Sequence, residues 1–229
     1  MSINKTDLQL NVAKNLDLIN QKIDASLKSA NRQRGDVKLI AVSKVQPVEK
    51  IEVALVEGHR LFGENRVQEA ALKWPALKIK YPNAKLHLIG PLQTNKVKDA
   101  IMLFDVIETL DRLKLAEEIK KQSVKKGSDI TCYVQVNTGE EQQKAGVFPA
   151  EAEEFVRYCQ KTVGLNITGL MCIPPINDMP KNHFEALRQL ANKNNLKELS
   201  IGMSNDYMEA LSFNPRYIRL GTLLFGNRK

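Results

Sequence analysis

The sequence predicts a single (β/α)8 barrel preceded by an extra N-terminal helix. From residue 38 onward, short apolar runs alternate with helical patterns, and this alternation is typical of parallel strands joined by crossover helices. About eight such units follow one another in roughly 190 residues, which is the unit count of a compact barrel. No linker-like or low-complexity stretch divides the chain, so residues 1–229 are expected to form one domain, with residues 1–36 packed on the barrel as a helix.

The first segment, about residues 4–33, has the pattern of one long amphipathic helix. Its apolar residues recur at steps of three and four, which places them on one face of a helix: Leu8, Val12, Leu16, Ile19, Ile23 and Leu27. Such a stripe could also form half of a coiled coil. Packing on the chain's own domain is the commoner arrangement and the one we expect.

The remaining elements follow from the same two patterns. Strands are predicted at 38–44, 59–63, 85–90, 104–109, 130–137, 165–171, 198–202 and 216–220. Helices are predicted at 47–57, 64–78, 94–101, 111–126, 149–162, 182–194 and 206–212. An open doubly wound sheet is the alternative architecture. No GxGxxG or GxxxxGK[ST] loop follows the first strand, which disfavours the dinucleotide-binding and P-loop versions of that sheet.

Composition argues against several classes of protein. The hydrophobic content of 43% is enough for a core, so disorder is not expected. No apolar run reaches the roughly 18 residues of a membrane span, and the first residues lack the apolar core of a signal peptide. Three cysteines without CxxC spacing, Cys132, Cys159 and Cys172, predict a cytoplasmic, reduced and metal-free protein.

The formal charge of +8 raises the question of nucleic-acid binding. The basic residues are scattered, however, and the densest stretch, 114–126, also carries Glu117 and Glu118 and no aromatic residue. That pattern is typical of a solvated helix face. We therefore expect no nucleic-acid partner, although the excess charge would attract anionic ligands.

Lys44 is the first candidate for chemistry. It ends the apolar run 38–44, and a buried strand rarely ends on an unpaired ammonium because desolvating that charge is costly. A lysine whose pKa is lowered in this way becomes a nucleophile suited to a Schiff base with an aldehyde. A lysine that merely points outward at a strand end is the commoner case, so Lys44 alone is weak evidence for Schiff-base chemistry.

Two segments near the C-terminus predict a phosphate site. Residues 202–206 open a predicted helix, where free backbone N–H groups favour an anion, although an ordinary N-cap by Ser204 or Asn205 would look the same. Gly221 and Thr222 follow the last predicted strand and add backbone donors and a hydroxyl. Phosphate sites in such barrels commonly use the loops after strands seven and eight.

Other polar residues of the strand ends have structural explanations as well as functional ones. Arg219 lies within an apolar strand and needs a partner, either a carboxylate of a neighbouring strand or a ligand atom. His87 is expected to be a satisfied core residue and Cys172 a packing residue. Glu64 and Glu69 are most simply charges in the first turn of a helix. No HExxH, GxSxG or paired Cys/His cluster occurs.

Taken together, a strand-end lysine, a phosphate site and an inward-facing arginine suggest pyridoxal phosphate (PLP). From about residue 38 to the C-terminus the chain resembles the PLP homeostasis proteins, the YggS/PROSC family. The seven segments that carry this resemblance are, in order, AVSK (41–44), FGENRVQE (62–69), HLIGPLQTNK (87–96), VNTGEEQQKAGV (136–147), GLMCIPP (169–175), SIGMSND (200–206) and IRLGTLLFGNR (218–228).

The resemblance implies a barrel similar to the N-terminal domain of alanine racemase, with PLP held as an aldimine. The residues that match the family's cofactor site by position are Lys44 for the Schiff base, Asn65 for a side-chain contact, Ser204, Gly221 and Thr222 for the phosphate, Ser200 and Met203 for the same wall, and Arg219 for the pyridine nitrogen. Two departures stand out. Arg66 replaces the usual tyrosine, and Leu223-Leu224 replaces Ala-Ile.

Three functions were compared: a PLP carrier without robust catalysis, a PLP enzyme such as an amino-acid racemase, and a nucleic-acid-binding protein. A PLP enzyme stabilises a carbanion best when the pyridine nitrogen is protonated, and the cationic Arg219 would keep that nitrogen neutral. We also expect no second domain after Lys229 to supply an opposing acid or base. We expect a cytoplasmic monomer that binds PLP and serves intracellular PLP homeostasis and amino-acid/keto-acid balance. Its expected partners are apo PLP-dependent enzymes.

Overall fold

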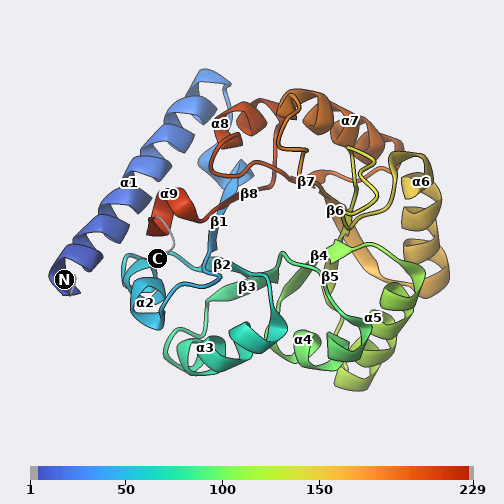
Figure 1. Cartoon of the computed structure of the whole chain (residues 1–229), viewed down its shortest axis with the longest axis horizontal. Coiled ribbons are helices and arrows are strands. Elements are labelled where there is room, and N and C mark those ends of the chain that lie inside the picture. Colours follow the sequence, from blue (N-terminus) through green and yellow to red (C-terminus); the bar gives the residue numbers. More distant parts are fainter. Residues whose placement is uncertain (1–4, 227–229) are drawn as a thin grey trace.

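A computed structural model describes residues 5–226, with side chains described from residue 11 onward. Eight parallel strands close into a barrel in the order β1 to β8, and helices surround it (Figure 1). The strands are β1 (Lys38–Val42), β2 (Leu61–Glu64), β3 (Lys85–Leu88), β4 (Val106–Leu110), β5 (Thr131–Gln135), β6 (Asn166–Met171), β7 (Glu198–Ser200) and β8 (Tyr217–Leu220). The predicted fold class is confirmed, and the open sheet is wrong because β1 pairs with β8.

The helices lie on the outside of the barrel. They are α1 (Lys5–Ser29), α2 (Val48–Val56), α3 (Val67–Lys80), α4 (Val97–Leu103), α5 (Leu113–Lys126), α6 (Pro149–Arg157), α7 (Pro180–Lys193), α8 (Tyr207–Ala210) and α9 (Thr222–Phe225). A π-helical segment, Tyr158–Val163, continues α6. Helix α9 was not predicted, since one turn is too short to show a periodic pattern. No helix within residues 5–226 is long and apolar enough to cross a membrane.

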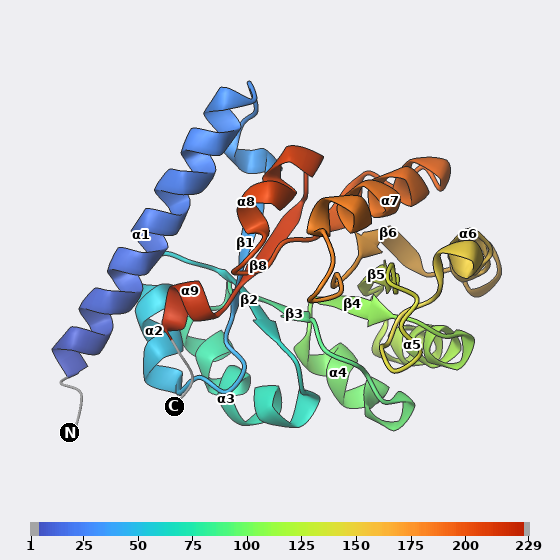
Figure 2. The same cartoon turned by 45° about the horizontal axis from the view of Figure 1, so that its top comes forward.

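Helix α1 packs along one side of the barrel rather than in a coiled coil within this chain (Figure 2). Its apolar stripe from Val12 to Leu27 is buried, and it lies against α2 and α9. The Asn15 side chain donates a hydrogen bond of 3.0 Å to the Leu224 carbonyl. The helix ends at Ser29, earlier than predicted, and Leu8 lies outside the residues whose side chains are described.

Two layers of side chains form the core because residues alternate between the two faces of each strand. The outward-facing layer is continuous with the helices and includes Leu39, Phe62 and Leu86. Among the described residues, the inward-facing layer contains two small apolar clusters, one around Ile40 and one around Tyr133. The rest of the barrel interior holds buried polar side chains: His87, Glu108, Ser200 and Arg219.

Candidate cofactor site at the carboxyl end of the barrel

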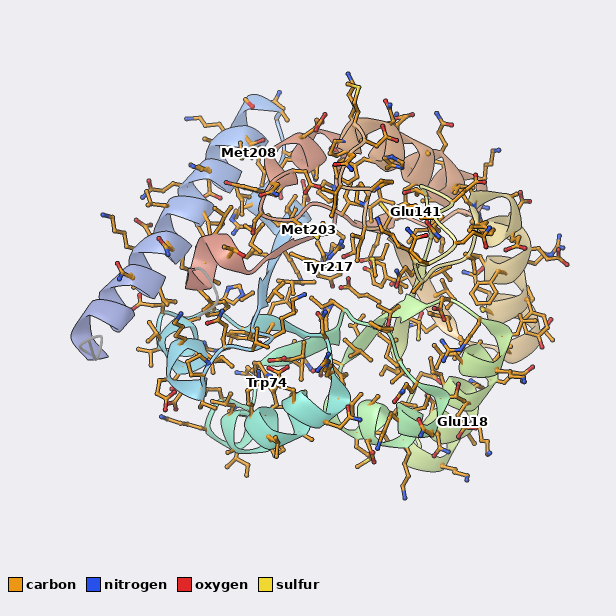
Figure 3. The ribbon with its side chains drawn as sticks, in the orientation of Figure 1. Trp74, Glu118, Glu141, Met203, Met208 and Tyr217 are labelled. Atoms are coloured by element: carbon orange, nitrogen blue, oxygen red, sulfur yellow. The ribbon has the colours of Figure 1, made fainter. Side chains whose placement is uncertain are left out.

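The predicted site residues lie at the carboxyl ends of four adjacent strands. β8 pairs with both β1 and β7, and β1 also pairs with β2, so the segments that follow these strands meet at one side of the barrel mouth. The residues brought to this side are Lys44, Asn65, Ser200, Met203, Ser204, Arg219, Gly221 and Thr222. In the view down the barrel, Met203 lies near the centre of the ring (Figure 3).

Lys44 sits in a tight turn directly after β1. Ser43 before it is buried, and its amide donates 3.0 Å to the Gly63 carbonyl. Val45 after it has φ +54°, a left-handed conformation that is costly for a β-branched residue. The Val45 amide donates to the Glu69 carboxylate. The turn that presents Lys44 is therefore strained and held from α3.

A buried ion network centred on Lys73 holds this turn in place. Its ammonium lies 2.7 Å from Glu64 Oε1 and 2.8 Å from Glu69 Oε1, and it donates 3.0 Å to the Ser43 carbonyl. Glu64 Oε1 also accepts bonds from the Ser43 hydroxyl at 2.7 Å and from Trp74 Nε1 at 3.2 Å. One lysine thus ties β2 and α3 to the residue before Lys44.

These positions correct one prediction. Glu64 is the last residue of β2 and fully buried, not a charge in a helix first turn. Burial raises its pKa, although the bonds from Lys73 and Ser43 oppose that shift. Glu69 does lie in the first turn of α3. Burial alone would raise the pKa of Glu69, but the bonds from Lys73 and Val45 bring it below its usual range.

A chain of hydrogen bonds runs through the barrel interior from Arg219. The guanidinium donates 2.7 Å to Ser200 Oγ and 2.8 Å to the Cys172 carbonyl. Ser200 Oγ donates 2.6 Å to Glu108 Oε2, and His87 Nδ1 lies 2.6 Å from Glu108 Oε1. Arg219 is only 4% exposed, so these bonds fix its plane and leave its other N–H groups for a ligand.

The interior chain bears on two predictions and on one residue that was not predicted. No carboxylate oxygen within residues 5–226 forms an ion pair with Arg219, so the predicted alternative of a direct salt bridge is wrong; the nearest link is through Ser200. Glu108 was missed. Burial would raise its pKa, but the bond from His87 and the charge of Arg219 hold the pKa below its usual range. Burial raises the pKa of the Cys172 thiol to about 12, which agrees with a packing role.

The loops after β7 and β8 present backbone donors. Within the described residues, no acceptor bonds the amides of Ser204, Asn205, Thr222 and Leu223. The Met203 amide is occupied by the Asp206 carboxylate. Helices α8 and α9 are single turns, so the donors come from individual amides rather than from a long helix dipole. Open amides beside the exposed Thr222 hydroxyl have the chemistry that a phosphate requires.

Asn65 is positioned by a close approach between two strand ends. A Cβ atom on Gly90 would lie 2.4 Å from the Asn65 carbonyl oxygen and 2.7 Å from its Cα. Only glycine fits at position 90, because these neighbours are backbone atoms that cannot move aside. Gly90, which follows β3, thereby sets the position of Asn65 at the mouth.

Comparisons with known proteins agree with this fold. A family model described as "Alanine racemase, N-terminal domain" matches residues 15–229. A relative from Haemophilus influenzae named pyridoxal phosphate homeostasis protein is 34% identical over 229 residues, covering 96% of this chain and 97% of the relative. A relative of the same name from Aquifex aeolicus is 36% identical over 229 residues, covering 96% and 100%.

Solved structures show the same likeness. PipY of Synechococcus elongatus with PLP bound has a TM-score of 0.78 at 33% identity, covering 94% of this chain and all of PipY (100%). Alanine racemase of Clostridium difficile has a TM-score of 0.71 at 15% identity, covering 95% of this chain and 56% of the racemase. The racemase comparison is evidence for the barrel fold alone.

Proposed function

Because the chain belongs to the alanine racemase N-terminal domain family and to the pyridoxal phosphate homeostasis proteins within it, we propose that it binds pyridoxal 5'-phosphate and acts in PLP homeostasis. The observation that carries the proposal is the gathering of Lys44, the buried Arg219 and the open amides after β7 and β8 at one side of the barrel mouth. The amine of Lys44 matches the aldehyde of PLP, the Arg219 cation matches its ring nitrogen, and the open backbone amides match its phosphate.

Lys44 is the proposed point of attachment, as a lysine aldimine. Its turn is fixed on both sides, by the Ser43 bonds and by the Val45 amide. Asn65, Ser200 and Met203 are proposed to line the ring, and Ser204, Gly221 and Thr222 to hold the phosphate. The cofactor supplies an electrophilic aldehyde and an electron-accepting ring; the protein positions the amine and the anion donors.

Borohydride trapping tests the attachment. The protein loaded with PLP should show an absorption band that borohydride removes, and peptide mapping should then find the tag on Lys44. Lys44→Ala should abolish the tag and retain the far-UV circular dichroism of the wild type. Lys96→Ala, which changes a lysine after β3, should keep the tag. A tag on Lys96 in the wild type would contradict the assignment.

We propose that the bound cofactor undergoes little turnover. Arg219 is permanently cationic, and its bonds to Ser200 and the Cys172 carbonyl hold it in the interior. A cation facing the pyridine nitrogen keeps that nitrogen unprotonated and weakens the ring as an electron acceptor. The alternative, a small racemase, requires rapid exchange of the α-proton.

Proton exchange separates these two functions. The PLP-loaded protein is incubated with alanine in D2O, and deuterium at Cα is followed by NMR beside free PLP and an authentic alanine racemase. The carrier function predicts exchange near that of free PLP. Exchange near the racemase rate would favour the enzyme. We further propose that the protein is a cytoplasmic monomer whose partners are apo PLP-dependent enzymes.

A further inference from the structure

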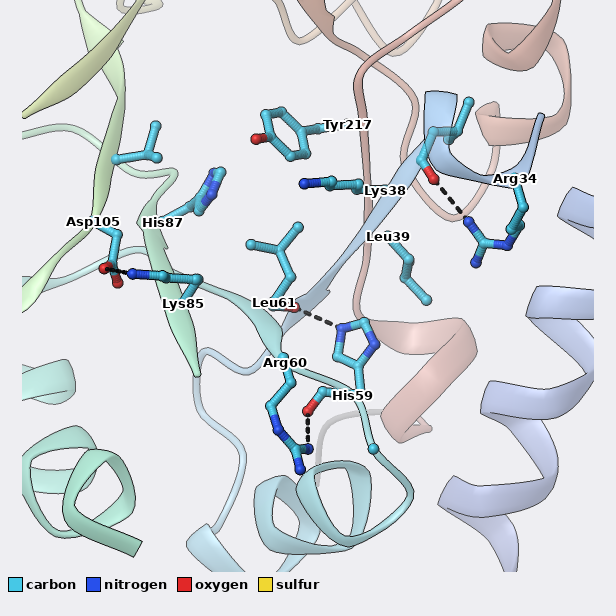
Figure 4. Close-up of a pocket in the computed structure, with 13 residues that line it drawn as sticks. Arg34, Lys38, Leu39, His59, Arg60, Leu61, Lys85, His87, Asp105 and Tyr217 are labelled. Carbon is cyan, nitrogen blue, oxygen red and sulfur yellow. Dashed lines mark hydrogen bonds and ion pairs between the residues drawn. The ribbon is translucent and has the colours of Figure 1, made fainter. Parts of the chain in front are cut away.

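A second pocket lies at the amino-terminal end of the barrel, opposite the proposed PLP site (Figure 4). Its volume is about 580 Å³, and its wall is built where β1, β2, β3, β4 and β8 begin. Pockets of this volume commonly take small molecules. None of the residues proposed to bind PLP lines it. We call it the amino-terminal pocket.

The amino-terminal pocket has an excess of positive charge. One carboxylate, Asp105, lines it together with four cationic side chains: Arg34, Lys38, Arg60 and Lys85. Asp105 is neutralised by Lys78 at 2.8 Å as well as by Lys85 at 3.0 Å. His59 also lines the pocket, but burial lowers its pKa to about 4, so it adds no charge at pH 7. The pocket therefore favours anions.

Lys38 is the cation left for a ligand. It begins β1 opposite Tyr217 of β8, and its side chain points toward Tyr217 and His87 in Figure 4. Among the described residues, nothing forms a hydrogen bond or ion pair with its exposed ammonium. The other cations are engaged: Arg34 pairs with Asp24 at 2.7 Å, and Arg60 donates 2.6 Å to the Leu55 carbonyl.

His87 adds a second polar group with unused capacity. Its side chain is 2% exposed and lines the pocket. Nδ1 lies 2.6 Å from the ionised Glu108 and therefore carries a proton. No partner of Nε2 lies within the described part of the chain. Nε2 therefore offers one further hydrogen bond to a ligand in the pocket.

We propose that the amino-terminal pocket binds a small organic anion, a carboxylate or phosphate monoester with an apolar body. The anionic group would lie against Lys38 and His87, and the body against Leu61 and Val106, which also line the pocket. A neutral molecule of the same shape would gain no ion pair with the exposed Lys38 ammonium and would bind more weakly. The site is independent of whether Lys44 holds PLP.

A titration followed by methyl NMR tests the site on the whole chain. The wild-type protein is titrated with benzoate, phenyl phosphate and benzamide. Benzoate or phenyl phosphate should shift the Leu61 and Val106 methyl signals to saturation, and the tighter of the two identifies the preferred anionic group. Equal shifts with the neutral benzamide would overturn the proposal. So would shifts confined to Ile173, on the loop after β6, and Leu223, in helix α9 after β8.

Substitutions then assign the charge. Lys38→Met should weaken binding of the preferred anion about tenfold or more, since a hydrogen bond to a charged group is lost, and Lys38→Arg should restore most of the affinity. Lys22→Met, which changes an exposed lysine of α1, should bind like the wild type. Unchanged affinity in a folded Lys38→Met protein would refute the site. If Lys38→Met fails to fold, the methyl shifts of the wild-type protein with benzoate, phenyl phosphate and benzamide decide whether the site exists.

Discussion

The Lys73 ammonium lies 2.7 Å from the Glu64 carboxylate inside the protein, with side-chain exposures of 10% and 0%. Glu64 belongs to β2 and Lys73 to α3, and both bind Ser43 at the end of β1. Glu64 accepts a hydrogen bond from the Ser43 hydroxyl, and Lys73 donates one to the Ser43 carbonyl. The pair therefore links the stability of the barrel wall to the placement of Lys44. Removing either charge leaves the other buried and uncompensated.

Lys73→Met should lower the free energy of unfolding by about 3–5 kcal/mol, since Glu64 would keep a buried charge without its cation. Urea unfolding at pH 7 measures the change. Adding Glu64→Gln should recover part of the loss, because the uncompensated charge is gone. Lys80→Met changes an exposed lysine of α3 that pairs with Glu52 of α2 and should cost much less, because solvent screens an exposed pair. Equal costs for the two lysines would contradict a buried network.

Val45→Asn should stabilise the protein by about 1 kcal/mol. Val45 has φ +54° and is 63% exposed, so asparagine relieves the left-handed strain with little loss of packing. Thermal unfolding gives the difference. Val56→Asn changes an exposed valine with helical backbone in α2 and should bring no gain. A loss of stability in Val45→Asn would mean that the valine side chain is needed at this turn.

Thr222→Ala should weaken PLP binding about tenfold or more, because one hydroxyl bond to a charged phosphate is lost, roughly 1.5–3 kcal/mol. Gly221→Val should be worse, since a Cβ atom already meets Val42 at 3.4 Å and a branched side chain would block the backbone. Equilibrium titration with PLP measures both. Thr162→Ala, an exposed threonine on the π-helical segment, serves as the control. Wild-type PLP affinity in both variants would contradict the placement of the phosphate at these loops.

Stability should fall as the pH drops from 6.5 toward 4 because of His59. Its pKa is about 4 in the folded protein and 6.5 ordinarily. The unfolded chain therefore binds the additional proton in this range, at up to about 1.4 kcal/mol per pH unit. His59→Gln should flatten the decline in urea unfolding between pH 6.5 and 5. Glu108 and Asp105, with lowered pKa values, act only at lower pH. A decline identical in both proteins would exclude His59 as its source.

The fold could be predicted because it rests on local patterns. Apolar runs and helical stripes repeat along the sequence, and eight of them imply closure. Element ends were less certain: α1 stops at Ser29, and the single turn α9 was not recognised. Short elements are stabilised by tertiary contacts, such as Asn15 to Leu224, which leave no periodic signal.

The site was only half predictable for a related reason. Residues at strand ends, such as Lys44 and Thr222, could be located from strand order. Glu108 lies inside the strand Val106–Leu110. A carboxylate two residues after Val106 on the same face of this strand was a signal that could have revealed an inward-facing side chain. Lys73 could not be found, because in sequence it resembles any solvated helix lysine. Its partner Glu64 lies on another element.

The pairing of β1 with β8 has a consequence for how the chain is made. Lys38 pairs with Tyr217 and Ala41 with Leu220. During synthesis β1 therefore cannot complete its pairing until β8 has left the ribosome. Until then β1 and β7 are sheet edges with unpaired backbone groups, which invite association with other chains. Contacts so far apart in sequence also slow folding. A premature stop before β8 should therefore yield an aggregation-prone fragment, and nascent chains should depend on chaperones until the ring closes.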